Sequence, residues 1–123
     1  MSILIVDDDP LLCSLLRMAL NREGFETHEV FSGKAALEYL SGALVDLVLL
    51  DVMMPHVDGW EVLGHLRQHP LTQHAPVIVC SILAQEDLAF SLGASDYLRK
   101  PVSRTAFLQA LERQTRRQGP GSP

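Results

Sequence analysis

Short runs of apolar residues alternate along this chain with longer stretches in which apolar residues recur every three or four positions. A short apolar run is typical of a strand buried on both faces, and the longer periodicity is typical of a helix with one buried face. The pattern predicts five strands, at residues 3–6, 27–31, 46–51, 76–81 and 95–100. It predicts five helices that alternate with them, at residues 10–24, 32–42, 58–69, 85–94 and 103–118.

The ends of the predicted helices carry residues that commonly begin or end a helix. Asp9 precedes Pro10, which suits a first helical turn, and Ser32 and Asp58 stand before two further helices. Gly24 closes the first helix. The alternation predicts an α/β fold, a single-domain doubly wound five-stranded parallel sheet with helices on both faces. Of the common strand orders, the flavodoxin-like order 2-1-3-4-5 suits five units, and it puts the ligand crevice at the carboxyl ends of strands 1 and 3.

The length and composition fit one globular domain and exclude some partners. The chain has 123 residues, of which 47% are hydrophobic, and we assign residues 1–118 to the domain. We expect residues 119–123, which are rich in glycine and proline, to be a disordered tail or a linker stub. A net charge of −5 argues against direct binding to nucleic acid or to an anionic membrane. The apolar runs are too short to cross a bilayer.

The two cysteines bear on the compartment. Cys13 and Cys80 stand far apart and form no Cys-x-x-Cys motif. We interpret both as buried free thiols in a reducing compartment, rather than as a disulfide or a metal site. No signal peptide is visible before the first strand, and we therefore expect a cytoplasmic location.

Three carboxylates stand where the first and third strands end. Asp7 and Asp8 follow the first strand, and Asp51 ends the third. If these strands are neighbours, the three groups share one pocket, and two like charges about 4–5 Å apart repel by roughly 3–4 kcal/mol. A divalent cation relieves that repulsion, and hard oxygen ligands beside a crevice suit Mg²⁺, with Mn²⁺ as a second choice. The alternative, that aspartates here only form caps and turns, suits Asp9 and Asp58 better.

The fourth and fifth strands end in a hydroxyl, Ser81, and a cation, Lys100. In a parallel sheet both groups lie at the same edge as the carboxylates, and Lys100 would project into the acidic pocket. An acidic pair for a metal, a further aspartate, a hydroxyl and an ammonium are the parts needed to place a phosphoryl group on Asp51. Lys100 and the metal would neutralise developing charge, and Ser81 would bind a phosphoryl oxygen.

These residues stand in four segments, ILIVDDDP, DLVLLDVMMPHVDG, PVIVCS and GASDYLRKP. Together, at these spacings, the segments resemble the receiver domain of bacterial response regulators, and the resemblance runs from Ile3 to about Arg113. It implies that Asp51 is the phospho-acceptor and also a metal ligand. It implies that Asp8 binds the metal directly and that Asp7 acts partly through water.

The resemblance implies further roles, residue by residue. The backbone carbonyl of Met53 is the remaining protein ligand of the metal. Lys100 is the lysine of the site, and its bond to Pro101 takes the cis form. Ser81 and Tyr97 form the pair of residues that respond to phosphorylation.

The function implied by the resemblance is that of a phosphotransfer acceptor rather than an enzyme. The domain would take a phosphoryl group from the phosphohistidine of a histidine kinase or a phosphotransfer domain onto Asp51, with Mg²⁺. Self-catalysed phosphorylation from small donors and slow autodephosphorylation are also implied. The added charge of about −1.5 to −2 would draw Ser81 toward it, open space for Tyr97 and change the face formed by the last two helices and the last strand. Partners, or a second copy of the chain in a homodimer, would bind that face.

Three features depart from the commonest receiver pattern. Val102 stands where an aromatic residue often follows the Lys-Pro pair. The stretch between Ser81 and Gly93 is short, which favours a reduced fourth helix. Met53 and Leu83, the residues that flank the acceptor in the family, are both apolar. Apolar flanks neither position nor activate water, so we expect a long-lived phosphorylated form.

Three other functions fit part of the pattern. A Mg²⁺-dependent phosphohydrolase with an aspartate nucleophile typically has a second aspartate two residues after the first, where this chain has Met53. A flavin or nucleotide binder needs a phosphate-binding loop after the first strand, where the acidic segment DDDP would repel phosphate. A receiver-like domain that folds but is never phosphorylated is opposed by the complete set of site residues.

Overall fold

The computed structural model describes residues 2–43, 45–52, 59–70 and 72–118. Within them the strands are β1 (Ser2–Val6), β2 (Glu26–Val30), β3 (Leu47–Asp51), β4 (Val77–Ser81) and β5 (Asp96–Arg99). The helices are α1 (Pro10–Arg22), α2 (Gly33–Leu40), α3 (Gly59–Gln68), α4 (Glu86–Ser91) and α5 (Arg104–Gln118). The predicted alternation of strand and helix is therefore confirmed for these residues.

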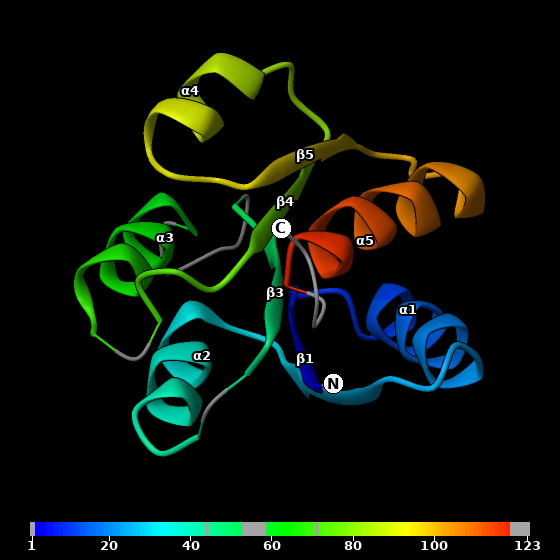
Figure 1. Ribbon diagram of the computed structural model, residues 1–123, viewed down its shortest axis with the longest axis horizontal. Helices are drawn as coiled ribbons and strands as arrows, with labels where there is room; N and C mark the ends of the chain where they lie inside the picture. Colours follow the sequence, from blue (N-terminus) through cyan, green and yellow to red (C-terminus); the bar gives the residue numbers. More distant parts are fainter. Residues whose placement is uncertain (1, 44, 53–58, 71, 119–123) are drawn as a thin grey trace.

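The strands form one parallel sheet in the order β2-β1-β3-β4-β5, which confirms the predicted fold class. Figure 1 shows α1 and α5 on one face of the sheet and α2 and α3 on the other, with α4 beside β5. The order in which successive strands extend the sheet reverses after β2, because β2 lies on one side of β1 and β3 lies on the other. The carboxyl ends of these two strands therefore border the crevice that this topology provides.

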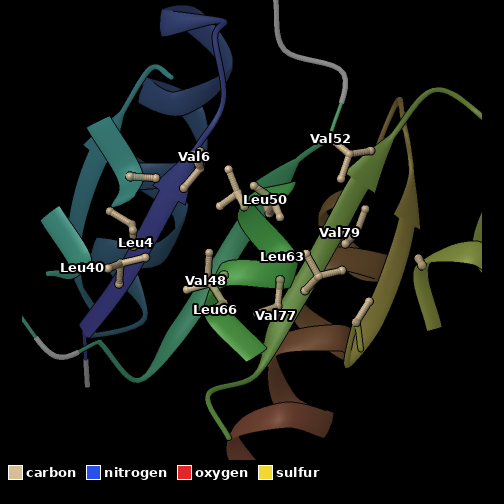
Figure 2. Close-up of a cluster of buried hydrophobic side chains, with 14 of the residues drawn as sticks. Leu4, Val6, Leu40, Val48, Leu50, Val52, Leu63, Leu66, Val77 and Val79 are labelled. Atoms are coloured by element: carbon tan, nitrogen blue, oxygen red, sulfur yellow. The ribbon is translucent and has the colours of Figure 1, made fainter. Parts of the chain in front are cut away.

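The strands β1, β3 and β4 are buried on both faces of the sheet, and their successive side chains point to opposite sides. Leu4 and Val6 of β1 join the cluster that packs under α2 and α3, as Figure 2 shows. Ile3 and Ile5 join the cluster beneath α1 and α5. Full burial of each such side chain contributes about 1.5–3 kcal/mol, so these two layers fix the position of every strand end.

The first helix begins and ends as its residues predict. The carboxylate of Asp9 accepts hydrogen bonds from the amides of Leu11 and Leu12 at 3.0 and 3.4 Å, and Pro10 occupies the first turn. Glu23 is the C-cap of α1. Gly24 follows it with a φ of +89°, a conformation that glycine adopts without a steric penalty.

The fourth helix is shorter than the predicted range of 85–94, because α4 ends at Ser91. The amide of Leu92 bonds back to the carbonyls of Leu88 and Ala89, and Gly93 then turns the chain with a φ of +106°. A turn in this left-handed conformation stops the helix. The expected cap Asp58 and the expected tail 119–123 lie outside the described residues. Among the described residues, no helix is both long and apolar enough to cross a membrane.

Candidate functional site

The two central strands bring their terminal aspartates together. Val6 of β1 lies beside Leu50 of β3, so Asp7 and Asp51 follow at the same level of the sheet. Both side chains are buried, at 3% and 5% exposure, whereas Asp8 is exposed. Oxygen atoms of Asp7, Asp8 and Asp51 all lie within 4.8 Å of one another. The pocket inferred from the strand ends is therefore present.

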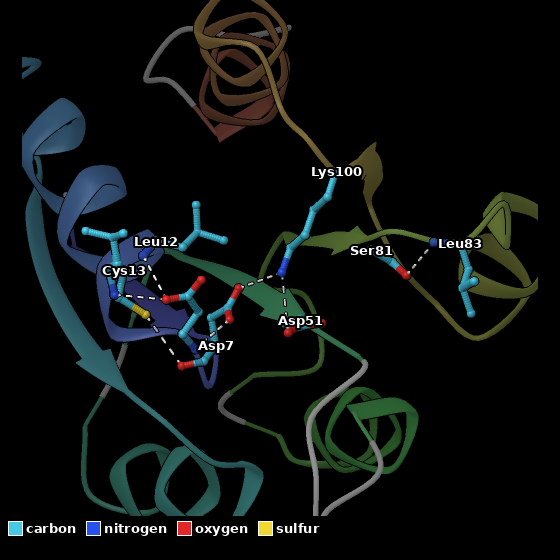
Figure 3. A network of polar contacts seen from close by, with 9 residues as sticks. Asp7, Leu12, Cys13, Asp51, Ser81, Leu83 and Lys100 are labelled. Atoms are coloured by element: carbon cyan, nitrogen blue, oxygen red, sulfur yellow. Dashed lines mark hydrogen bonds and ion pairs between the residues drawn. The ribbon is translucent and has the colours of Figure 1, made fainter.

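The ammonium of Lys100 lies between two of these carboxylates (Figure 3). Its Nζ is 3.0 Å from Oδ2 of Asp7 and 3.4 Å from Oδ2 of Asp51. Lys100 follows β5, its amide donates to the carbonyl of Ser81 at 2.8 Å, and the Lys100–Pro101 bond is cis. Burial would lower the pKa of Lys100, but the hydrogen bond to Asp7 and the charges of Asp51 and Asp7 outweigh it and raise the pKa above its ordinary value.

Two further contacts hold Asp7 in place. Its Oδ1 accepts a hydrogen bond from the amide of Asp9 at 3.0 Å, and its backbone carbonyl accepts one from Sγ of Cys13 at 3.5 Å. The second contact links the start of α1 to the end of β1, and both are drawn in Figure 3. Oδ2 of the same carboxylate remains directed at Lys100.

A close approach between α3 and β3 supports the other aspartate. A side chain at Gly59 would collide with the Cα atom of Val52 and crowd the carbonyl oxygen of Asp51. Only glycine therefore lets the first turn of α3 pack against the chain directly after Asp51. This close contact could not be predicted from the sequence, because it depends on how α3 lies against β3.

Ser81 and Tyr97 meet at the peptide groups of one loop residue. The amide of Leu83 donates to Oγ of Ser81 at 3.1 Å, and the hydroxyl of Tyr97 donates to the carbonyl oxygen of Leu83. Ser81 is fully buried and Tyr97 is 9% exposed. Tyr97 is thus already buried, whereas we expected its side chain to move inward only after Ser81 moves. The role of the Leu83 backbone was missed, since main-chain contacts leave no signal in residue types.

The donor set fits a small divalent cation. Three carboxylates supply hard oxygen atoms at one point beside an open crevice, which is the environment that Mg²⁺ and Mn²⁺ prefer. The carbonyl of Met53, expected as a further ligand, lies outside the described residues. The ammonium of Lys100 offsets part of the negative charge in the structure, since it pairs with two of the three groups.

Comparisons with known proteins identify relatives of nearly the whole chain. The family model for the response regulator receiver domain matches residues 3–112. A Vibrio cholerae protein named "Probable cyclic di-GMP phosphodiesterase" is 43% identical over 105 residues, which cover 83% of this chain and 24% of that protein. The regulatory protein VanRc of Enterococcus gallinarum is 34% identical over 119 residues, covering 94% of this chain and 50% of that protein. This chain thus spans half or less of the length of these two relatives.

Solved structures share the fold. The signal receiver domain of a signal transduction histidine kinase from Syntrophus aciditrophicus superimposes with a TM-score of 0.87 and 30% identity, covering 99% of this chain and 94% of that one. The family model spans nearly the whole sheet and reaches from β1 into α5. This chain therefore belongs to the family of response regulator receiver domains.

Proposed function

We propose that this domain accepts a phosphoryl group on the side chain of Asp51. The observation that carries the proposal is the convergence of Asp7, Asp8 and Asp51 with the ammonium of Lys100 at the carboxyl edge of the sheet. Receiver domains of two-component systems are phospho-acceptors that interact with histidine kinases. The proposed donor is therefore the phosphohistidine of a histidine kinase or of a phosphotransfer domain, and the proposed location is the cytoplasm.

In the proposed reaction, a carboxylate oxygen of Asp51 attacks the phosphorus atom of the phosphohistidine. The new O–P bond forms as the P–N bond breaks, and the imidazole leaves with the electron pair of that bond. Lys100 would turn from the carboxylates toward the negative charge of the transferred group. The domain would act as an acceptor rather than as an enzyme with turnover.

The proposed cofactor is Mg²⁺, with Mn²⁺ as the alternative ion. Asp7, Asp8 and Asp51 are the described residues that would hold it, and the carbonyl of Met53 is proposed as a further ligand. When bound, the ion supplies positive charge that offsets the repulsion between the aspartates and the phosphoryl oxygens. The matched acidic pocket of receiver domains supports this assignment.

The proposed response runs through the backbone of Leu83. Oγ of Ser81 accepts from the Leu83 amide and is directed away from Asp51 (Figure 3), so the side chain would have to rotate to bring its hydroxyl to a phosphoryl oxygen on Asp51. The same residue's carbonyl holds the hydroxyl of Tyr97, so a shift of the loop would release or redirect that side chain. Residues that follow Leu83 lead directly into α4, which places the change on the face made by α4, β5 and α5.

That face is the proposed surface for partners, including a second copy of this chain in a homodimer. Ile82, Leu88 and Phe90 are 60%, 42% and 49% exposed, which leaves apolar side chains on and beside α4 uncovered. The chain's net charge of −5 supports a protein partner rather than nucleic acid or a membrane. Light scattering with and without beryllofluoride, which mimics the phosphoryl group, would test whether the chain dimerises.

The central proposal is tested with a small phosphoryl donor. Incubation with Mg²⁺ and acetyl phosphate should add about 80 Da, the mass of one phosphoryl group, on Asp51. The variant Asp51→Asn should gain nothing, and the exposed Asp87→Asn should behave as the parent chain. Removing the donor should then show slow loss of the added mass. A folded parent chain that gains no mass and binds no beryllofluoride would make it a receiver-like domain without phosphotransfer.

A further inference from the structure

A cavity of about 370 Å³ lies between α1, α5 and the sheet, beside the carboxylate pocket but extending away from it. Its walls include Leu12 and Leu16 of α1, Leu49 and Cys80 of the sheet, and Phe107 of α5. Leu15 also lines it and is 56% exposed, so the cavity opens to solvent on the α1 side. This volume lies within the range of protein sites for small organic molecules.

The lining favours an apolar occupant. Apolar side chains, leucines above all, form most of the wall, so a polar molecule would lose hydrogen bonds to water without replacing them. Much smaller apolar cavities in proteins stay dry and bind aromatic molecules. The apolar body of a ligand therefore gains burial here, whereas water gains few partners.

The charged residues that line the cavity indicate which polar group a bound molecule would carry. Lys100 pairs with both Asp7 and Asp51, so its ammonium is already engaged and offsets part of their negative charge. Arg104, the first residue of α5, also lines the cavity and has an exposed side chain. Within the part of the chain that the structure describes, its guanidinium has no ion pair or hydrogen bond. It is the lining cation that remains available to an anion.

We propose that this cavity binds a small amphipathic organic anion, such as an aryl or medium-chain carboxylate. The apolar body fills the space between α1 and α5, and the anionic group pairs with Arg104. The proposal is independent of phosphotransfer at Asp51, because it requires only the cavity and the guanidinium.

Two fluorescent probes with one skeleton test it: anilinonaphthalene sulfonate and its uncharged parent phenylnaphthylamine. Two variants fill the cavity from opposite walls, Val102→Phe beside α5 and Ala19→Phe on α1. Each should weaken binding of both probes about tenfold or more, while circular dichroism and thermal unfolding show a folded chain. Leu88→Phe, which enlarges an exposed apolar side chain of α4 instead, should leave both affinities unchanged.

The charge is tested separately. The parent chain should bind the sulfonate more tightly than the uncharged probe, and Arg104→Gln should remove that difference. Arg99→Gln, at an exposed position of β5, is the matched control and should preserve it. If either folded filling variant binds the sulfonate as the parent does, the probe lies elsewhere and the proposed site is wrong. Equal affinities for the two probes in the parent chain would refute the anionic class of ligand.

Discussion

Lys100 has an unusual position for a lysine, since its side chain is only 20% exposed and its ammonium contacts two carboxylates that repel each other. Its partners come from β1 and β3, while Lys100 itself follows β5. A single cation thus ties the middle of the sheet to its edge. The raised pKa of Lys100 keeps this charge in place throughout the neutral range.

Replacing Lys100 by methionine should therefore destabilise the chain. Without the ammonium, Asp7 and Asp51 face each other uncompensated, and we expect the free energy of unfolding to fall by about 2 kcal/mol in the absence of divalent ions. Urea denaturation would measure this change, and Mg²⁺ should restore part of the loss. Lys34→Met, at an exposed position of α2, should have little effect. A parent-like stability of Lys100→Met would show that the ion pairs contribute nothing net.

The two thiols should be inert in the folded chain. Burial raises the pKa of Cys13 and Cys80 from 9.0 to about 12, and for Cys13 the charge of Asp7 adds to the rise. At pH 8 the thiolate fraction should then be about a thousandth of that of an unfolded thiol. Iodoacetamide labelling, followed by mass spectrometry with and without denaturant, measures the difference.

The same shift has a consequence for stability against pH. Because both thiols hold their protons more tightly in the folded chain, their contribution is complete below pH 9.0 and is lost as the pH rises toward 12. Cys13→Ala and Cys80→Ala together should reduce the alkaline loss of stability. Rapid labelling of either cysteine in the folded chain at pH 8 would contradict this assignment.

Residue types allowed part of the site to be inferred. Asp7, Asp8 and Asp51 could be placed together because parallel strands end at one edge of a sheet. Arg67 could not be foreseen. Its guanidinium donates to the carbonyls of Gly93 and Ala75 at 2.8 and 2.6 Å and so ties α3 to two loops. Such contacts depend on loop conformations, which residue periodicity does not determine.

At the scale of elements, α4 exposes large apolar side chains and buries polar atoms, the reverse of the usual distribution. Leu88 and Phe90 are exposed, Ala89 is the buried residue, and two side-chain oxygens near the start of the helix are buried. These are Oε1 of Gln85 and Oε1 of Glu86, neither of which has a hydrogen-bond partner in the described part of the chain. A buried polar atom without a partner costs free energy, so these two oxygens reduce the stability of the start of α4.

Replacing Glu86 by methionine should therefore stabilise the chain. The buried oxygen disappears and an apolar group of similar length takes its place, so we expect a gain of about 1 kcal/mol, despite the loss of a favourable charge at the start of the helix. Chemical denaturation would detect it. Asp87→Met removes an exposed charge from the same turn and should be neutral or slightly destabilising. A loss of stability in Glu86→Met equal to that in Asp87→Met would show that the burial has no cost.

The element boundaries could be predicted to within a few residues, and the errors have local causes. The strands β1, β3 and β4 were recognisable because both of their faces are buried and their apolar runs are short, whereas the edge strand β2 has only one fully buried residue. The predicted helix 32–42 ends at Leu40, where the amide of Ser41 bonds back to Leu37 and the chain turns. The predicted helix 85–94 is cut at both ends, since Gln85 makes no side-chain cap and Gly93 turns the chain.

At the scale of the whole molecule, an ion bound at the strand ends is linked to global stability. A ligand that binds only the folded chain adds about 1.4 kcal/mol at ten times its dissociation constant. Thermal unfolding in MgCl₂, compared with NaCl at equal ionic strength, should show this increase. Asp8→Asn should lose most of the increase, because it removes one of the clustered oxygen ligands, and Asp87→Asn should retain it. An equal response of all three chains would place the ion elsewhere.

The fold class followed from alternation alone, because five strand and helix units can bury their apolar faces in few ways. Connection rules narrowed the strand order to common alternatives, and the order 2-1-3-4-5 was chosen among them because it suits five units. The cavity between α1 and α5 had no counterpart in the sequence argument. Its volume depends on helix spacing, which the packing of many side chains sets together.

The salt bridge between Asp7 and Lys100 joins positions separated by 93 residues. Loop closure over such a distance is entropically costly, and the contact requires the segment after β5 to be in place beside β1. During synthesis, a nascent chain could assemble β1 and β3 and gather its negative charges well before the compensating lysine emerges. The completed ion-pair network therefore forms only after β5 has docked beside the rest of the sheet.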